Sequence, residues 1–369
     1  MSNFEYIVLD KPEERSIRRF YEDLSTLGDF HFSISREPDF FEAIEVEGND
    51  PEIFVMRRIC SREIIGALIT SEKECFINAK ETSMGYISSL RLAEQYRNHL
   101  LGFYAKAFYR HQLERGRKIS LMTIFEDNSV AKKNLLSGKG RLPSMKDLGQ
   151  IHTLIFKPVI RNEKEKQLSD TDIRSANSED IPMITDFLKR TGKDKTFFPV
   201  YRENHFNSDR GILKNLKMKD IALAFHNGEL SGVMGLWDQN EFRRWKIYAY
   251  SFRLKLIKPL INIYSRLKKK PLLPPSNKPF YYRNLALVCI RNNDHKVFNR
   301  LLQYHMNSLS KSNKVYIAYS MHESSPFLRN FPLPNIDLKS RLYFTYWKED
   351  EAMVSSIIPG EIYLETGGL

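Results

Sequence analysis

Eight residues, QYRNHLLG from Gln95 to Gly102, stand where a phosphate-binding turn would lie, although Gly102 is the one glycine among them. They follow a run rich in strand formers, MGYISSLRLA, and they open a segment with helical periodicity. The N-terminus of a helix presents backbone N–H groups without intrahelical partners and a partial positive charge, so anions bind there. Arg97 and His99 could add direct contacts to phosphate oxygens. The stretch therefore predicts an anion site where a strand meets a helix.

The surrounding pattern predicts the elements that hold this turn. We expect a helix through the turn to about Arg115, because Leu101, Tyr104 and Phe108 form an apolar stripe and Gly116 can end the helix. The other elements expected before residue 160 are strands at 5–11, 84–93, 118–125 and 150–158, helices at 12–27 and 128–136, and a β-hairpin at 53–71 that turns near residues 60–62.

A similar order of elements begins again after residue 170. A strand and helix at 171–190 are followed by a hairpin at 220–238, and the two hairpins share the phrases EIIGALI and ELSGVMGL. Further strands are expected at 284–290, 314–320 and 341–347, with helices at 293–310 and 325–331. The repeat predicts two α+β domains, 1–160 and 171–369, joined by a charged linker at 161–170.

Composition limits the class of protein. The chain has 369 residues, 42% of them hydrophobic, and no apolar run approaches the ~20 residues that a membrane span needs. The N-terminus lacks the apolar core of a secretion signal. The three cysteines, Cys60, Cys75 and Cys289, lie far apart without a CxxC motif, which indicates a reducing compartment and no zinc site. We expect a cytoplasmic protein.

The net charge of +12 is concentrated in one segment. Residues 243–278 contain 11 Lys or Arg and no acid, so the rest of the chain carries about +1 (12 − 11). We assign this segment to an insertion at 241–280 in the second domain. It could be an amphipathic helix or flap on an anionic lipid or substrate. It could instead bind RNA, with Trp245 stacking on bases, or be a solvated excursion that packs on the second domain.

The order of elements resembles the GNAT fold of acyl-CoA N-acyltransferases, and two stretches carry the resemblance. In that family a strand ends in a consensus like L-x-V-x-P-x-x-R-x-x-G-x-G/A. LRLAEQYRNHLLG matches it at the positions of Leu90, Leu92, Gln95, Arg97 and Gly102, while Leu100 replaces the first glycine. The family's later N-x-x-A matches Asn128 and Ala131. The resemblance implies a fold of two GNAT-like domains, each with a mixed, mostly antiparallel sheet flanked by helices, and a cofactor, acetyl-CoA or another acyl-CoA.

The resemblance also implies which residues bind the cofactor. Backbone amides of the turn would hold the pyrophosphate, and Asn128 would lie near the pantetheine arm. The full set that we predict is Leu90, Arg91, Leu92, Arg97, Asn98, His99, Leu100, Leu101, Gly102, Asn128 and Ala131. The corresponding turn of the second copy, IRNNDHKVFNR, lacks both glycines, and Asp294 would repel a pyrophosphate. We expect that copy to bind no cofactor and to form a wall of the substrate cleft.

The catalytic groups follow less directly from the sequence. The family often has a tyrosine acid seven residues after the asparagine, where this chain has Leu135. Tyr86 on the central strand is our substitute, and Ser88 could hold a water near the thioester. For the base we choose Glu45 from FFEAIEVEG, where Glu45 and Glu47 share a face if the segment is a strand.

These residues predict an acyl-CoA-dependent N-acyltransferase, with acetyl as the first choice of acyl group and a small-molecule or peptide amine as acceptor. Two alternatives stay open. The peptidoglycan-bridge aminoacyltransferases also pair two such domains and use aminoacyl-tRNA, which the basic insertion would suit. The departures at Leu100 and Leu135 would also fit a non-catalytic acyl-CoA-binding protein or scaffold.

Overall fold

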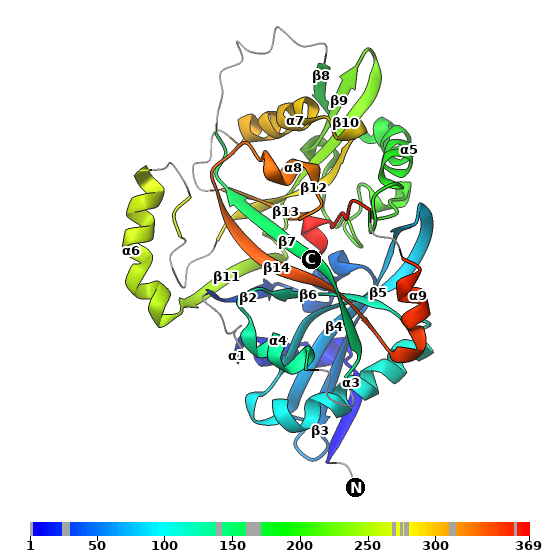
Figure 1. Cartoon of the computed structure of the whole chain (residues 1–369), viewed down its shortest axis with the longest axis vertical. Coiled ribbons are helices and arrows are strands. Elements are labelled where there is room, and N and C mark those ends of the chain that lie inside the picture. The colour runs from blue at the N-terminus through cyan, green and yellow to red at the C-terminus, as the bar shows by residue number, and fades with distance from the viewer. Residues whose placement is uncertain are drawn as a thin grey trace.

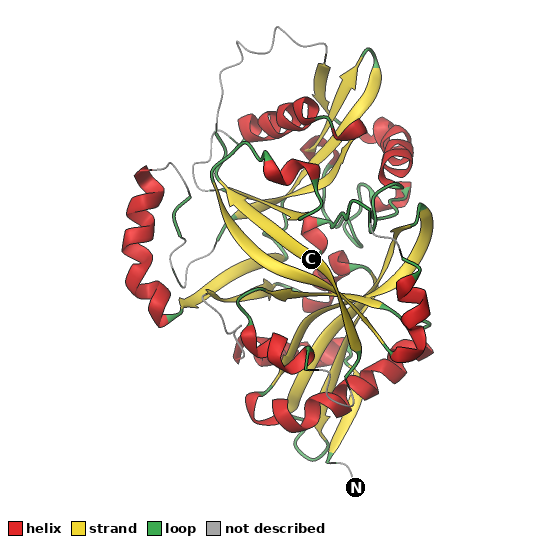
Figure 2. Ribbon diagram, viewed as in Figure 1, coloured by secondary structure: helices red, strands yellow, loops and turns green. Residues whose placement is uncertain are grey.

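Twelve strands form one continuous sheet in the part of the chain that the structure describes (Figures 1 and 2). This computed structural model describes residues 3–23, 30–137, 142–159, 171–267, 271–273, 276, 280–309, 315–357 and 360–369. In spatial order the strands are β1 (Phe4–Val8), β3 (Asn49–Arg58), β4 (Ile64–Ile77), β5 (Lys80–Leu92), β6 (Ser120–Phe125), β14 (Asn335–Tyr346), β7 (Ser144–Phe156), β13 (Tyr316–His322), β12 (Tyr282–Ile290), β10 (Glu229–Trp237), β9 (Ile221–His226) and β8 (Thr171–Ser175).

The two halves of the chain, 3–159 and 171–369, exchange their last strands. β14 of the second half lies between β6 and β7 of the first, and pairs with both of them in antiparallel register. β7 of the first half in turn pairs with β13 of the second half, from Ile151–His322 to Phe156–Ile317. The centre of the sheet is therefore built from both halves (Figure 1).

Two parallel strand pairs interrupt the otherwise antiparallel sheet, one in each half. β5 pairs with β6 only from Gly85–Ser120 to Ile87–Met122, and β12 pairs with β13 only from Tyr282–Tyr316 to Asn284–Ala318. Beyond these short ladders the strands of each pair separate. We call the two gaps the first splay, between β5 and β6, and the second splay, between β12 and β13.

Helices cover both faces of the first half. α3 (Arg97–Glu114) packs Tyr104 and Phe108 against Phe54 and Met122 on one face. α1 (Glu14–Asp23) and α2 (Phe40–Ile44) pack on the opposite face, where Ile53 is buried. Neighbouring residues of a strand point to opposite faces, so β3 serves both layers. α4 (Ser129–Leu135) follows β6, and a two-stranded sheet of β2 (Phe30–Arg36) and β11 (Arg243–Tyr250) joins the halves.

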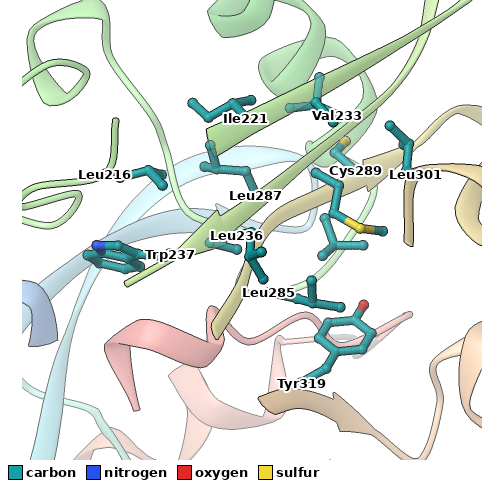
Figure 3. Packing of buried hydrophobic residues seen from close by; sticks show 14 of the residues in the cluster. Leu216, Ile221, Val233, Leu236, Trp237, Leu285, Leu287, Cys289, Leu301 and Tyr319 are labelled. Carbon is teal, nitrogen blue, oxygen red and sulfur yellow. The ribbon is translucent and has the colours of Figure 1, made fainter. Parts of the chain in front are cut away.

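The second half has the largest core, which lies around β10 and β12. Figure 3 shows part of it, with Trp237 and Tyr319 among the buried side chains. The covering helices are α5 (Ile181–Gly192), α7 (His295–Ser308) and α8 (Pro326–Arg329), and α9 (Glu351–Ser355) follows β14. α6 (Phe252–Leu267) extends from the end of β11 at the side of the molecule (Figure 1).

The predicted fold class, α+β with a mainly antiparallel sheet flanked by helices, is confirmed. α3 ends where Gly116 adopts a left-handed φ of 72°. The alternative of a strand near Glu45 is wrong, because α2 and a 3-10 turn at Glu45–Glu47 occupy that segment. β2 was not predicted, and β11, from the expected insertion, pairs with β2 of the first half. The linker expected at 161–170 lies outside the described residues.

Candidate functional site

A cavity of about 260 Å³ opens at the first splay. Its walls come from the first half and from the segments of the second half that cross over it. Of the predicted cofactor and catalytic residues, the cavity is lined by Tyr86, Ser88, Leu90, Arg91, Leu92, Arg97, Leu101, Asn128 and Ala131. The second half contributes Arg243, Trp245 and Tyr282, and the final stretch contributes Thr366 and Leu369.

A β-bulge in β5 shapes the floor of this cavity. The register with β4 shifts between Ile69–Ser88 and Ala67–Arg91, and Ser89 takes a left-handed φ of 53°. A bulge leaves a residue without a ladder partner and redirects the strand. The ladder to β6 has already ended at Ile87–Met122, so the β6 side of Ser88, Ser89 and Leu90 faces the cavity instead of a strand.

The second splay has a matching bulge, but the chain itself fills it. Leu287 of β12 has a φ of 54°, and the register with β10 shifts there. The amide of Leu287 donates to Glu365 Oε2 at 2.9 Å, and the amide of Val288 donates to the Tyr363 hydroxyl at 3.2 Å. Burial raises the pKa of Glu365. The stretch around Tyr363–Thr366 thus occupies in the second half the position that is open in the first.

The helices that follow the two splays differ in whether a side chain caps their N-terminus. At the start of α7 the Asp294 carboxylate accepts hydrogen bonds from the amides of Lys296 (2.7 Å) and Val297 (3.4 Å). α3 continues a 3-10 turn at Glu94–Tyr96, and neither Ala93 before that turn nor Tyr96 before α3 makes a side-chain capping hydrogen bond. The uncapped helix end therefore adjoins the open cavity, and the capped one adjoins the filled splay.

The motif residues occupy distinct places around this helix end. Arg97 donates from Nε to the Leu92 carbonyl at 3.0 Å, which holds its side chain at the cavity. Asn128 Oδ1 accepts from the Ala131 amide at 3.0 Å, so this asparagine caps α4 while it lines the cavity. Leu100 packs against the Tyr104 core, and neither Leu100 nor Gly102 lines the cavity. The side chains of Asn98 and His99 lie outside the described residues.

The candidate catalytic residues are separated by the fold. Tyr86 is buried at the cavity wall, and its burial raises the pKa of its hydroxyl. Ser88 also lines the cavity and donates to Glu47 Oε2. Glu45 is not among the cavity-lining residues, and its carboxylate accepts from the Gly211 amide at 3.0 Å and contacts Arg210 at 3.0 Å.

Glu47, beneath the cavity, is the centre of a buried ionic network. Its side chain has 0% exposure and lies 2.8 Å from Arg36 and 3.5 Å from Arg243. Burial alone would raise the pKa of Glu47, but the two guanidiniums and the Ser88 hydroxyl outweigh burial and hold it below the ordinary value. Arg36 also donates to the Ser89 hydroxyl at 2.9 Å, so the network reaches the bulge.

Sequence reasoning noticed Glu47 but missed its partners. Arg36, Glu47 and Arg243 are brought together by the pairing of β2 with β11, which joins segments about 200 residues apart. No local pattern signals such a contact. The one available sign was the acid-free run that begins at Arg243, which the charge count attributed to the insertion as a whole.

The fold is that of the GNAT-type acyl-CoA N-acyltransferases. A structure of Saccharomyces cerevisiae N-myristoyltransferase with bound myristoyl-CoA superposes with a TM-score of 0.56 at 11% identity, covering 94% of this chain and 79% of that one. A GCN5-related glucosamine N-acetyltransferase region of a fungal multi-domain GH3 β-N-acetylglucosaminidase gives a TM-score of 0.62 at 13% identity, covering 93% of this chain and 38% of that one. No protein-family model and no curated protein sequence matches this chain.

Proposed function

We propose that this protein is an acyl-CoA-dependent N-acyltransferase that binds acyl-CoA at the first splay and transfers the acyl group to an amine. The observation that carries the proposal is the contrast between the two splays. The first is open and is followed by a helix without a side-chain cap, whereas the second is filled and is followed by a capped helix. The residues of the family motif that line the first splay are Leu90, Leu92, Arg97, Asn128 and Ala131. Both structural neighbours are N-acyltransferases by description.

The start of α3 and Arg97 would bind the pyrophosphate of coenzyme A. The N-terminus of a helix attracts anions through its dipole, and a guanidinium forms charge-assisted hydrogen bonds to phosphate. The pantetheine arm would lie along the first splay between β5 and α4, where Asn128 and Ala131 face the cavity. Leu100 is compatible with this site because it packs inward with the α3 core.

The bulge at Ser89 would orient the thioester. In the second splay the equivalent amide, that of Leu287, donates to a carboxylate oxygen at 2.9 Å. By the same geometry, an amide at the first bulge would donate to the thioester carbonyl and stabilise the oxyanion that forms on attack. The amine nitrogen forms the new C–N bond, the C–S bond breaks, and the amine gives up one proton as coenzyme A leaves as the thiol.

The acyl group is acetyl or a longer chain. A second, apolar cavity of about 60 Å³ adjoins the first beneath α3 and shares the walls formed by Ile87, Leu90, Leu101, Met122 and Leu135. Such a cavity favours a chain longer than acetyl, because burying apolar groups is favourable. A neighbour that binds myristoyl-CoA has the same fold.

Calorimetric titration with acyl-CoA tests cofactor binding, and thiol release with a panel of amines tests transfer. We expect the wild type to bind, and Arg97→Ala to weaken binding by about tenfold, which corresponds to one charge-assisted hydrogen bond. Arg291→Ala, at the matching turn of the second half, is the control and should bind like the wild type, since Arg291 pairs with Glu229 away from the cavity.

Three outcomes would point away from the proposal. No heat and no thermal stabilisation with any acyl-CoA would remove the cofactor site. Binding without thiol release for every amine would favour a non-catalytic acyl-CoA-binding protein. Salt-sensitive binding of tRNA in the absence of acyl-CoA binding would favour an aminoacyl-tRNA-dependent enzyme.

A further inference from the structure

One wall of the cavity carries polar atoms that lack partners. Tyr21 of α1, Arg36 of β2 and Arg91 of β5 all line the cavity. The Tyr21 hydroxyl and the Nε atoms of Arg36 and Arg91 are buried and make no hydrogen bond in the part of the chain that the structure describes. The residue exposures of Tyr21 and Arg36 are 7% and 3%. Unsatisfied buried donors are costly, so such a group of them indicates a missing ligand.

The charges at this wall are also unbalanced. Glu47 contacts Arg36 at 2.8 Å and is shared with Arg243. Arg91 contacts no carboxylate among the described residues, and it donates to the Leu90 carbonyl at 3.2 Å. Burial, followed by the nearby cations Arg36 and Arg97, lowers the pKa of Arg91. A buried guanidinium is stable only when an anion accompanies it.

Aromatic packing fixes this wall in place. The Tyr21 ring stacks on the Phe40 ring with centroids 5.7 Å apart, and the Arg36 guanidinium lies 5.1 Å from the centroid of the Phe40 ring. α1 and α2 cover the face of the sheet opposite α3. The unpartnered donors are therefore separated by the sheet from the helix end proposed for the pyrophosphate, while Arg36 reaches the Ser89 bulge through a 2.9 Å hydrogen bond.

We propose that Tyr21, Arg36 and Arg91 bind an oxyanion of the acceptor, so that the acceptor is an amine that carries a carboxylate or a phosphate. This inference rests on the proposed function and specifies its acceptor. The oxyanion accepts hydrogen bonds from the Tyr21 hydroxyl and the two guanidiniums, which leaves the amine toward the thioester at the bulge. A carboxylate and a phosphate share this chemistry, and the choice of acceptors below separates them.

Paired acceptors test the inference. Amino acids are compared with their carboxamides, and aminoalkyl phosphates with the corresponding amino alcohols, by kcat/KM for thiol release and by direct calorimetric binding. We expect the anionic member of at least one pair to be favoured by about a hundredfold or more, as two charged hydrogen bonds imply. Arg91→Met should remove that preference, and Tyr21→Phe should reduce it by about tenfold.

The controls separate this inference from the proposed function. Tyr21→Phe should bind acyl-CoA like the wild type, because the Tyr21 side chain lies across the sheet from α3. If Arg91→Met weakens the binding of acyl-CoA as much as the binding of the acceptor, the oxyanion belongs to the cofactor and the inference is wrong. Acyl-CoA turnover with neutral and anionic amines alike would also overturn it, although the proposed function would stand. Loss of all acyl-CoA binding in the wild type would instead remove the proposed function.

A second inference comes from α6, whose outer face has no covering element in the described structure. Seven large apolar side chains of this helix are exposed, including Phe252 at 79% and Leu267 at 78%; the others are Leu256, Ile257, Leu260, Ile263 and Tyr264. Helical geometry places five of them, at 252, 256, 260, 263 and 267, within an arc of about 80°. The opposite side of the helix packs Leu254 and Ile261 against the end of β11.

Cations surround this apolar face. Arg253, Lys255 and Arg266 flank this face on the helix, whereas Lys258 lies over the Tyr250 ring on the packed side. Lys268–Lys270 follow the helix in the sequence, and residues 243–278 contain no acid. An apolar face with a cationic border suits the interface of an anionic lipid bilayer. No helix in the described ranges combines the length and apolarity that crossing a bilayer requires. We infer that α6 lies in the surface of an anionic membrane with this face in the lipid.

Sedimentation with vesicles tests the membrane inference. Wild-type protein should partition onto phosphatidylcholine vesicles that contain phosphatidylserine, and much less onto phosphatidylcholine alone or at high salt. The double variant Leu256→Gln with Leu260→Gln should lower the partition coefficient by about tenfold or more. Ile59→Gln removes an exposed apolar side chain from the β3–β4 turn and should have no effect.

Two results would overturn the membrane inference. One is wild-type protein that stays in the supernatant with anionic vesicles. The other is a wild-type dimer in light scattering that the double variant converts to a monomer, since a second copy of the chain would then cover α6.

Discussion

At the scale of single residues, Glu47 joins the stability of the protein to the shape of its site. Its carboxylate is shared by Arg36, Arg243 and Ser88, and each of these side chains also lines the cavity. Arg243 additionally donates to the main-chain oxygens of Gly367, at 2.8 Å, and of Leu369. A single buried carboxylate thus holds the bulge, β2, β11 and the final stretch around the cavity.

Removing the charge of Glu47 should therefore destabilise the fold. We expect Glu47→Gln to lower the free energy of unfolding by about 3–5 kcal/mol, because two buried guanidiniums lose their counter-ion. Glu45→Gln, two residues earlier and bonded to Arg210 and Gly211, is the matched control and should cost about 1 kcal/mol or less. Chemical denaturation measures the free energy of unfolding of both variants. Equal losses in the two would contradict the role of Glu47 as the centre of the ionic network.

His305 should make stability depend on pH. Its Nε2 donates to the Met234 carbonyl at 2.9 Å, and burial lowers its pKa from 6.5 to about 4. The unfolded chain therefore takes up the proton first, so stability is lost as pH falls from about 6.5 toward 4, by ~3 kcal/mol in all. The free energy of unfolding, measured by chemical denaturation at several pH values, should depend less on pH between 6.5 and 4 in His305→Gln. His226→Gln, at an exposed position, should keep the pH dependence of the wild type.

At the scale of elements, the two splays show how one arrangement of strands serves two purposes. Both contain a bulge with a left-handed residue, Ser89 or Leu287, and both precede a helix. The side chains near each splay determine whether it is open or filled by the chain itself. Asp294 and Glu365 accept hydrogen bonds from amides of the second half, whereas neither Ala93 nor Tyr96 makes a side-chain capping hydrogen bond before α3.

The apolar cavity beneath α3 should make acyl-CoA affinity depend on chain length. Titration with acetyl-, butyryl-, octanoyl- and myristoyl-CoA should show the Kd falling by up to about fourfold per CH₂ until the cavity is full. Ala105→Phe fills this cavity and should abolish the gain. Lys106→Phe, a change at the next residue, which is exposed, should keep the gain in affinity with chain length. An affinity that is equal for all four chains would show that the cavity holds no acyl group.

The elements that carry local patterns could be predicted, and those made by distant pairing could not. The strand before Arg97, the helix after it and the short helix near Asn128 are each specified within about ten residues, and the structure has all of them. Arg36 and Arg243 came to the site through β2 and β11, whose pairing no periodicity reveals. The assignment of Glu45 in place of Glu47 failed to anticipate which carboxylate is buried, because that depends on the turn after α2.

At the scale of the whole molecule, the exchange of β7 and β14 ties the halves into one cooperative unit. We propose that the boundaries at 160 and 171 mark two related units that are not independent in folding. Fragments 1–160 and 171–369, expressed separately, should lack cooperative unfolding, because each leaves a central strand without its partner. Mixed together, they should form a complex with the circular dichroism of the intact chain. A fragment that unfolds cooperatively alone would contradict this expectation.

The exchange also sets a delay during synthesis. β6 pairs with β14, which begins 215 residues later (335 − 120). At typical translation rates of roughly 5–20 residues per second, the nascent chain waits for roughly 10–40 s with one edge of β6 unpaired. An exposed strand edge is prone to pair with other chains. We therefore expect the yield of folded protein in a cell to rise with chaperones that bind the growing chain until β14 has emerged.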